Sequence, residues 1–467
     1  MLMGIKYKAN PTDEQKLVLS QWMGCAKTIW NAKCDEDKYL RSYAKKYLPI
    51  GTFPEVDQEY SKYKSKELTP WLFSCPSQIL RNSSTNWYKT YWKFIKGECG
   101  RPRRKKKIDE GSIHLTKELF EFKKNRGGSY QLFIGSKNKN IGFLSIKTHK
   151  KVIHPQSIYI KKRNGEYSVS FCYQDKVSEK DLIKKKSYLK RLSKLDISEL
   201  NEMTEGIDRG IKIAIQGTEK AYDYTEIEKK RLVSLEKKRK RYQKWMAKQV
   251  LTSNRRKKTK RKIAKTYIKQ ANIRNNFCHQ KSHELVNKTD KKVFVFENLK
   301  TKNMTRKPKA KQDKHGRWLK NKARAKAGLN KAILSKGWYK LELYTTYKAF
   351  RAKKVVFKVS PYHTSQECAD CGHIQPENRK TQASFLCCSC GHAENADINA
   401  AKVIKKRAVN LIKHSGTELS KTGVLTNPDI GHGDICKTTE GKPTLAVIKK
   451  TRNRKEVSKE KELRRCA

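Results

Sequence analysis

The stretch that decides the fold is SQECADCGHIQPENRKTQASFLCCSCGHAENADINAAKVI, residues 365–404. It contains two Cys-x-x-Cys pairs separated by fifteen residues, and each pair is followed by a glycine. The four cysteines are Cys368, Cys371, Cys387 and Cys390. A tight turn lets two thiolates point at one ion, and two such turns complete a closed tetrahedral site that suits structural Zn²⁺. We therefore predict that these four cysteines hold zinc, and that Cys388 is left over.

Three carboxylates stand at the ends of regular elements. Asp208 lies in GIDRGIKIAI, where isoleucines alternate as in a strand, and Glu297 ends the apolar run KKVFVFE. Asp397 begins the helical pattern DINAAKVIKKRAVNLI directly after the cysteines. Carboxylates that converge repel unless cations lie between them, and Mg²⁺ prefers oxygen ligands with phosphate co-ligands. We predict a two-ion Mg²⁺ site, although spacing alone leaves open three unrelated acids.

The composition points to a polyanionic partner. The 467 residues include 108 Lys and Arg against 45 Asp and Glu, which gives a net charge of +63. Such a chain repels itself unless a polyanion neutralises it, and nucleic acid is the natural candidate, with strongly salt-dependent binding. A solvated basic surface, or binding to a membrane surface or heparin, is the alternative.

Cysteine usage and hydropathy predict a cytoplasmic protein. Eight cysteines outside residues 365–404 are scattered singly, without the spacing of a disulfide framework. The first residues, MLMGIKYKAN, lack the apolar core of a signal peptide, and no run reaches the roughly 18 apolar residues of a membrane span. We expect a reducing, intracellular location and no membrane partner.

Changes in composition and hydrophobic pattern along the chain divide it into three parts. Residues 1–200 read as a small β-barrel or sheet with a helical insertion at about 12–100; Thr12 and Gln15 form a capping-box pattern, and Asn164-Gly165 predicts a hairpin turn. Residues 201–412 combine strands with a long helical stretch at about 226–288 and a basic segment, 301–331, which we expect to be a mobile loop. Residues 413–467 are polar, basic and weakly periodic, and we expect a disordered tail.

These motifs resemble the TnpB nucleases encoded by insertion sequences and the related compact type V CRISPR effectors. GIDRGIK looks like the first RuvC motif, VFVFENLKTKNM the second and ENADINAA the third. TSQECADCGH and FLCCSCG look like the inserted zinc ribbon of that family. The resemblance covers roughly residues 4–410, and it rests on the order of the whole set of motifs.

The resemblance implies a multidomain α/β protein. The expected parts are an RNase H-like RuvC domain with a zinc ribbon at about 363–393, and an N-terminal oligonucleotide-wedge barrel with a helical recognition insertion. It implies that Asp208, Glu297 and Asp397 are catalytic Mg²⁺ ligands. The implied activity is RNA-guided cleavage of double-stranded DNA, next to a short adjacent motif, by one RuvC site.

Candidate contacts to nucleic acid are less specific. Polar residues at the start of the second helix could reach base edges, and basic clusters follow elsewhere. The candidates are Ser77, Arg81, Asn82, Arg103, Arg104, Arg209, Arg255, Arg256 and Arg274. TnpB members often have an apolar residue in place of Arg209, so we expect this side chain either to contact the scissile backbone or to face solvent.

Rival functions from other classes remain. An RNA-guided DNA-binding protein without cleavage would not need all three acids. A transposase that joins DNA strands would work without RNA, since RNase H-like folds also host that chemistry. A zinc-ribbon transcription regulator would leave the acids structural. The sequence determines neither the guide RNA nor the oligomeric state.

Overall fold

The computed structural model describes residues 2–49, 55–106, 110–124, 130–148, 152, 154–174, 181–420 and 422–427. The chain divides into two compact units. Unit 1 comprises residues 1–182 and 239–267, and unit 2 comprises residues 183–238 and 268–467. Each unit has its own sheet and its own apolar core.

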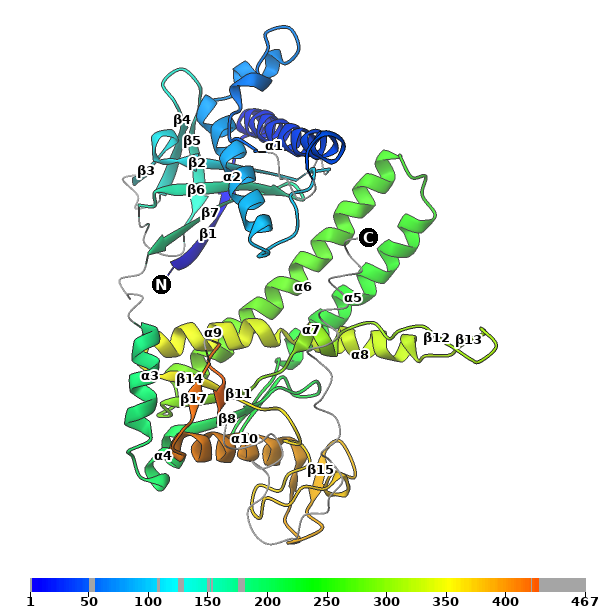
Figure 1. Ribbon diagram of the computed structural model, residues 1–467. Helices are drawn as coiled ribbons and strands as arrows, with labels where there is room; N and C mark the ends of the chain where they lie inside the picture. Colours follow the sequence, from blue (N-terminus) through cyan, green and yellow to red (C-terminus); the bar gives the residue numbers. More distant parts are fainter. Residues whose placement is uncertain are drawn as a thin grey trace. The chain divides into compact units, whose positions relative to one another are not determined.

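Unit 1 is built on a seven-stranded antiparallel sheet (Figure 1). Its strand order is β2-β6-β7-β1-β5-β4-β3. The strands are β1 (Leu2–Asn10), β2 (Gly111–Thr116), β3 (Phe120–Lys124), β4 (Tyr130–Gly135), β5 (Asn140–Lys147), β6 (Ser157–Arg163) and β7 (Glu166–Gln174). Strands β6 and β7 pair around Asn164-Gly165, so the predicted hairpin is confirmed.

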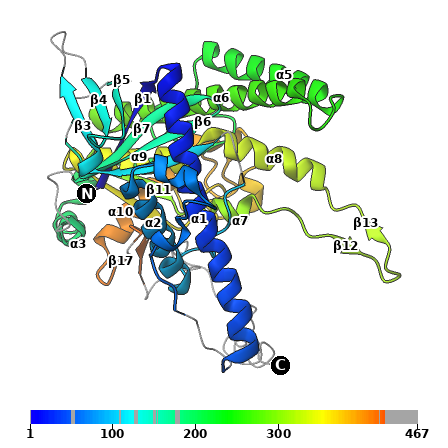
Figure 2. The ribbon, with the colours of Figure 1, turned by 90° about the horizontal axis from the view of Figure 1, so that it is seen from above.

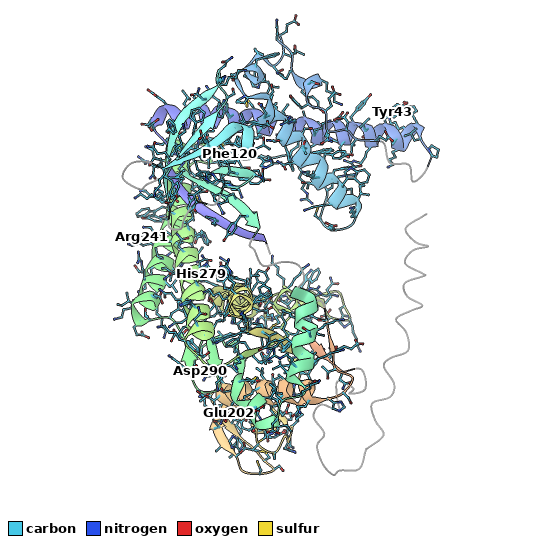
Figure 3. All side chains as sticks on the ribbon, turned by 90° about the vertical axis from the view of Figure 1, so that its left-hand side faces the viewer. Tyr43, Phe120, Glu202, Arg241, His279 and Asp290 are labelled. Atoms are coloured by element: carbon cyan, nitrogen blue, oxygen red, sulfur yellow. The ribbon has the colours of Figure 1, made fainter. Side chains whose placement is uncertain are left out.

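Two long helices accompany this sheet, α1 (Asp13–Tyr47) and α2 (Ser77–Ile95). The predicted capping box is confirmed, because Gln15 N donates to the Thr12 hydroxyl and Thr12 N donates to Gln15 Oε1. The sheet-proximal part of α1 buries Leu19 and Trp22 in the core. Its far end exposes tyrosines, among them Tyr43, which points away from the core (Figure 3).

Unit 2 is built on a five-stranded mixed sheet with the order β10-β9-β8-β11-β14. Strands β8, β11 and β14 are parallel, and β9 and β10 are antiparallel. Their bounds are β8 (Thr204–Asp208), β9 (Ile215–Gly217), β10 (Ala221–Tyr222), β11 (Val293–Glu297) and β14 (Val355–Val359).

Both faces of this sheet are covered, which explains why its central strand is continuously apolar. Phe294 and Phe296 of β11 belong to the core that contains Leu341 of α9 (Trp338–Arg351), whereas Val293 and Val295 pack into the core of α10 (Ala396–Lys413). Figure 1 shows α9 and α10 on opposite sides of the strands. A parallel strand between two layers of helices has no solvent face, so all five residues of β11 are buried.

The helices of unit 2, or shared between the units, are α3 (Asp181–Leu192), α4 (Ile197–Met203), α5 (Glu226–Ala247), α6 (Asn254–Asn287), α7 (Thr301–Met304), α8 (Ala323–Lys336), α9 (Trp338–Arg351) and α10 (Ala396–Lys413). Helices α5 and α6 confirm the helical stretch predicted at 226–288, and the division between the units falls within both helices. Among the described helices, none combines the length and the apolar composition that crossing a bilayer requires.

Two expectations about unstructured segments are wrong. Residues 301–331 contain α7, the hairpin β12 (Lys311–Gln312) and β13 (Trp318–Leu319), and most of α8, and Figure 2 shows this hairpin on an extended arm. The Asp313 carboxylate orders the turn, because it accepts hydrogen bonds from two backbone N–H groups, those of His315 and Arg317.

The second correction concerns the start of the predicted tail. Residues 418–426 contain β17 (Glu418–Leu419) and β18 (Leu425–Thr426). Lys358 N donates to the Gly423 carbonyl, and Leu425 is buried in the core of α10. This segment has too few apolar side chains to show a periodic pattern, but those few are enough to pack it against unit 2. Residues 421 and 428–467 lie outside the described part of the chain.

Candidate functional site

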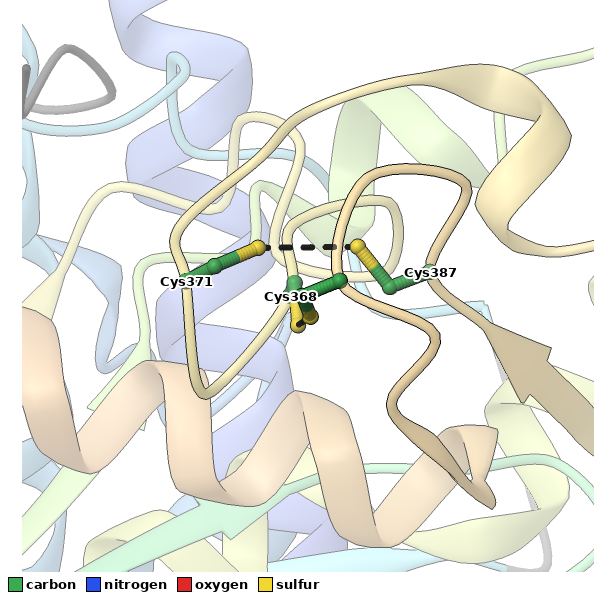
Figure 4. A group of neighbouring side chains, drawn as sticks. Cys368, Cys371 and Cys387 are labelled. Carbon is green, nitrogen blue, oxygen red and sulfur yellow. Dashed lines mark hydrogen bonds between the residues drawn. The ribbon is translucent and has the colours of Figure 1, made fainter.

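The four predicted zinc cysteines come together (Figure 4). Their sulfur atoms all lie within 4.8 Å of one another, with Cys368 Sγ 3.7 Å from Cys390 Sγ and Cys371 Sγ 3.5 Å from Cys387 Sγ. Sulfurs bound tetrahedrally to zinc at about 2.3 Å would lie about 3.8 Å apart. The cluster therefore fits a structural zinc ion, and Cys388, which is exposed, is not part of it.

Two matching turns hold these cysteines. Gly372 N donates to the Cys368 carbonyl, and Gly391 N donates to the Cys387 carbonyl. Both glycines have positive φ angles, 78° and 73°, which other residues adopt only with strain. The sequence signal of a glycine after each Cys-x-x-Cys pair thus has a direct conformational cause.

Asp208 and Glu297 are brought together by neighbouring strands. Each is the last residue of its strand, β8 and β11, which are parallel and paired up to Ile207 and Phe296. Both carboxylates therefore stand at the carboxyl edge of the sheet, where open α/β sheets place their ligands.

Asp397 reaches the same edge from α10. It is the second residue of that helix, and its backbone N–H donates to the Asn395 side chain, which caps the helix. Gly206 of β8 permits the close contact of helix and strand, because a Cβ atom there would lie 2.0 Å from the Ala401 carbonyl oxygen. A glycine two residues before Asp208 is thus what lets α10 pack closely on β8.

The three acids are close enough for the charges of two of them to affect the ionisation of the third. Burial, then the negative charges of Glu297 and Asp397, raise the pKa of Asp208 to about 7. Burial also raises the pKa of Glu297. Unlike the cysteines, the three carboxylates are not among the described groups whose ligand atoms all lie within 4.8 Å.

Two residues of this group were missed by the sequence reasoning. The Thr364 hydroxyl donates to Glu297 Oε1 at 2.6 Å, and the Arg379 guanidinium lies 3.2 Å from Asp397 Oδ1. Arg379 lies between the two cysteine pairs, and it is the one arginine in that segment. The signal available in the sequence was an arginine 18 residues before a predicted catalytic acid.

The cysteine segment, residues 363–395, is fastened to α10. The buried Arg407 pairs with Glu367, and Asn399 donates to the Glu367 carbonyl at 2.8 Å and accepts from Ala369 N at 2.9 Å. Because α10 also carries Asp397, these bonds link the cysteine cluster to the third acid. They support the idea that the cluster sets how this helix begins.

The residues predicted to contact nucleic acid differ in how exposed they are. Ser77, Arg81, Arg103 and Arg255 are exposed, as contacts require. Arg104 is exposed in part and paired with Asp35, and Arg274 is half-buried.

Three of these predicted contacts are buried or occupied for a structural reason. Asn82 is buried in unit 1 and donates to the His114 carbonyl, so it cannot read a base. Arg256 donates to backbone carbonyls at the end of α5, including that of Gln249 at 3.0 Å. Arg209 is buried in unit 2, so the alternative that it faces solvent is wrong, and its contact with the scissile backbone stays a prediction.

A basic, aromatic groove of about 830 Å³ lies on unit 1 between its two long helices and its sheet. Its lysines include Lys89, Lys93 and Lys96, which follow one face of α2. The stacked rings of His114 and Tyr159 lie 4.4 Å apart at its base. Cations beside aromatic faces suit a phosphate backbone with accessible bases. This groove was not predicted, because its strands are far from α2 in the sequence.

Comparison with known families matches three segments of the chain. The OrfB/IS605 family described as "Probable transposase" matches residues 198–308, and its helix-turn-helix domain matches residues 1–36. The family described as "Cas12f1-like, TNB domain" matches residues 338–404. The two larger matches contain all three acids and all four clustered cysteines.

Individual proteins agree with these matches. InsQ of Escherichia coli (strain K12), whose name proposes an RNA-guided DNA endonuclease, is 26% identical over 411 residues, 86% of this chain and 91% of InsQ. The CRISPR-associated endodeoxyribonuclease Cas12f1 of Sulfoacidibacillus thermotolerans is 46% identical over 67 residues, 14% of this chain and 16% of that protein. The TnpB-like protein L79 of Acanthamoeba polyphaga mimivirus is 27% identical over 158 residues, 33% of this chain and 27% of L79.

The chain is similar to the TnpB and Cas12f1 proteins. The cryo-EM structure of a Cas12f1–sgRNA–target DNA complex contains a chain of the same fold, with a TM-score of 0.51 at 14% identity. The likeness covers 84% of this chain and 83% of that one. The resemblance to TnpB nucleases and compact type V CRISPR effectors, predicted from motif order, is thus confirmed.

Proposed function

We propose that this chain is an RNA-guided endonuclease that cuts double-stranded DNA beside a short adjacent motif. The observation that carries the proposal is the meeting of Asp208, Glu297 and Asp397 at one sheet edge, where burial and then the charges of Glu297 and Asp397 raise the pKa of Asp208. A folded protein retains such mutual repulsion where cation binding or catalysis requires it. In this proposal unit 2 is the RNase H-like RuvC domain.

The three carboxylates are the proposed ligands of Mg²⁺. Two such ions would supply the charge that activates the attacking water and stabilises the leaving oxygen of a phosphodiester. The chain itself orients the acids: Thr364 fixes one oxygen of Glu297, and Asn395 fixes the helix turn that carries Asp397. Arg379 neutralises Asp397 and is also placed to contact a phosphate beside it.

The nucleic-acid partners are proposed from charge and from the names of relatives. The net charge of +63 and the lysine-lined groove of unit 1 suit a guide RNA and a DNA duplex. In this proposal the sheet of unit 1 is the oligonucleotide-wedge barrel, and its long helices are the recognition insertion. Pairing with the guide would read the sequence, and the protein would hold the heteroduplex by its backbone.

The test starts from RNA that co-purifies with the full chain, which sequencing identifies as the guide. A plasmid carrying the matching target is then incubated with the protein–RNA complex and Mg²⁺. We expect guide-dependent cleavage that Asp208→Ala lowers by at least about 10³-fold, because loss of a metal ligand removes several kcal/mol of transition-state stabilisation.

The matched control is Glu377→Ala, which removes an exposed acid of the cysteine segment and should cleave normally. Guide-dependent DNA binding by Asp208→Ala should remain. Strand joining without RNA would favour a transposase instead, and binding without any cleavage by the unaltered protein would favour a DNA-binding function.

A further inference from the structure

Arg209 follows Asp208 directly, yet its side chain turns across the sheet edge. Its Nη2 donates to the Glu297 carbonyl oxygen at 2.5 Å, and its Nη1 donates to Glu342 Oε2 at 2.7 Å. The side chain is 2% exposed, and the guanidinium lies over the Phe296 ring, 5.4 Å from its centroid. A guanidinium this deeply buried is tolerated only with such partners.

Glu342 extends this contact to a third strand. Its other carboxylate oxygen, Oε1, lies 2.5 Å from the ammonium of Lys358, the penultimate residue of β14. Glu342 therefore joins the residue that follows β8 to the strand on the far side of β11. Glu342 lies on α9, and this helix contacts the chain after Asp208 at a second point. Trp338 Nε1 donates a hydrogen bond to the Gly210 carbonyl at 3.3 Å.

We propose that Arg209, Glu342 and Lys358 form a brace that sets the spacing of Asp208 and Glu297. The brace, defined by these three residues, fixes the backbone beside one acid directly to the backbone of the other. Its role as a metal-site brace rests on the function proposed above. Arg209 is a positioning residue in this account, since it bonds the Glu297 main chain and leaves both carboxylates available.

Electrostatics give the brace a second effect. The positive charge of Arg209 opposes the rise in the pKa of Glu297 that burial causes. Two buried acids at the ends of adjacent strands repel, so the edge would spread without a cation fixed behind them. Arginine suits this place because its planar fork reaches two acceptors at once, which the single ammonium of lysine does with less precision.

The test measures Mn²⁺ binding by electron paramagnetic resonance on the full chain without nucleic acid, so that it does not depend on cleavage. Arg209→Met should weaken Mn²⁺ binding at least tenfold, and Arg209→Lys should fall between Arg209→Met and the unaltered protein. Lys402→Met is the control, because it removes only the ion pair with Glu394. Asp208→Ala defines the signal that does not come from the acid group.

A double-mutant cycle keeps the brace testable apart from metal. Arg209→Met and Lys358→Met should be non-additive in unfolding stability, because both act through Glu342. Additivity, or Mn²⁺ binding by folded Arg209→Met or Arg209→Lys that equals that of the unaltered protein, would overturn the inference. If Arg209 instead contacts a phosphate, Arg209→Met will reduce the slope of the logarithm of the DNA-binding constant against the logarithm of salt concentration by about 1. Mn²⁺ binding will then be unchanged.

The outcomes also separate this inference from the proposed function. If Asp208→Ala binds Mn²⁺ as the unaltered protein does, the acids hold no metal, and the proposed function and the inference both fail. If Asp208→Ala loses the ion and Arg209→Met keeps it, the proposed function stands and the brace alone is wrong.

Discussion

The two candidate metal groups of unit 2 differ in how the chain assembles them. The cysteine cluster comes from one segment of 23 residues, 368–390, and its four sulfurs already lie within 4.8 Å of one another. The carboxylate group comes from Asp208, Glu297 and Asp397, on three elements separated by 89 and 100 residues (297 − 208 = 89; 397 − 297 = 100). The first is closed by local turns, and the second exists only when the sheet and α10 have packed.

This difference fits two uses of a metal. A closed tetrahedral site has no position for substrate, so its ion contributes folding energy and no chemistry. A looser group of oxygen ligands at a sheet edge leaves positions for a phosphate and water. Hydrogen bonds from Arg407 and Asn399 of α10 to Glu367 connect the cysteine segment to the helix that carries Asp397. We therefore expect the cysteine cluster to support the geometry of the carboxylate group.

The largest effect on stability should come from opening the closed group. Cys371→Ser removes a zinc ligand, and zinc binding supplies about 10–16 kcal/mol to the folding of small zinc peptides. We expect loss of the ion by metal analysis and rapid proteolysis within residues 363–395. The matched control is Cys388→Ser, which should keep both zinc and protection. Equal protection of Cys371→Ser and the unaltered protein would contradict a structural zinc.

A smaller effect should follow from disturbing the packing that assembles the open group. Gly206→Ala places a Cβ atom against the Ala401 carbonyl of α10, and the backbone there cannot easily yield. We expect a loss of about 2–3 kcal/mol in unfolding free energy, and lower cleavage with zinc retained. Gly328→Ala on α8 is the control, since nothing lies within 4 Å of its new Cβ. A neutral Gly206→Ala would remove the packing argument.

The smallest effect has the opposite sign. The raised pKa of Asp208, about 7, means that its ionised form is disfavoured in the folded state, so folding loses stability as pH rises from about 4 to about 7. Asp208→Asn removes this cost, and at pH 8 without Mg²⁺ we expect a gain on the order of 1–2 kcal/mol. The gain should shrink at pH 5. A loss of stability at pH 8 would show that the acids do not repel.

Local signals in the sequence predicted the parts of the site that local chemistry forms. Spacing and glycines predicted the cysteine cluster, and the continuous apolar run placed Glu297 at a strand end. Alternating isoleucines placed Asp208 in a strand that was expected to continue to Ile215, but β8 ends at Asp208 and residues 211–214 form a bend. Asp397 followed from the start of an apolar helix. The capping box at Thr12 and the hairpin turn at Asn164 were predicted for the same reason, since each depends on residues within a few positions.

Long-range partners explain what could not be predicted. Arg209 is buried because Glu342 lies beside it, 133 residues further along the chain. Asn82 is buried because β2 folds against α2, and Arg379 meets Asp397 only after α10 docks. The segment that contains β17 and β18 packs through very few apolar residues. Its polar, basic composition therefore gave no sign that it would be ordered. The domain boundaries drawn from the sequence stay predictions.

The contrast between the two metal groups can be tested in one measurement. The protein–RNA complex is dialysed against EDTA under native conditions, and zinc content and plasmid cleavage are measured before and after Mg²⁺ alone is added. We expect one zinc ion retained per chain, no cleavage after dialysis, and full recovery of cleavage with Mg²⁺. Cleavage that persists without Mg²⁺, or that returns only when zinc is restored, would contradict this expectation.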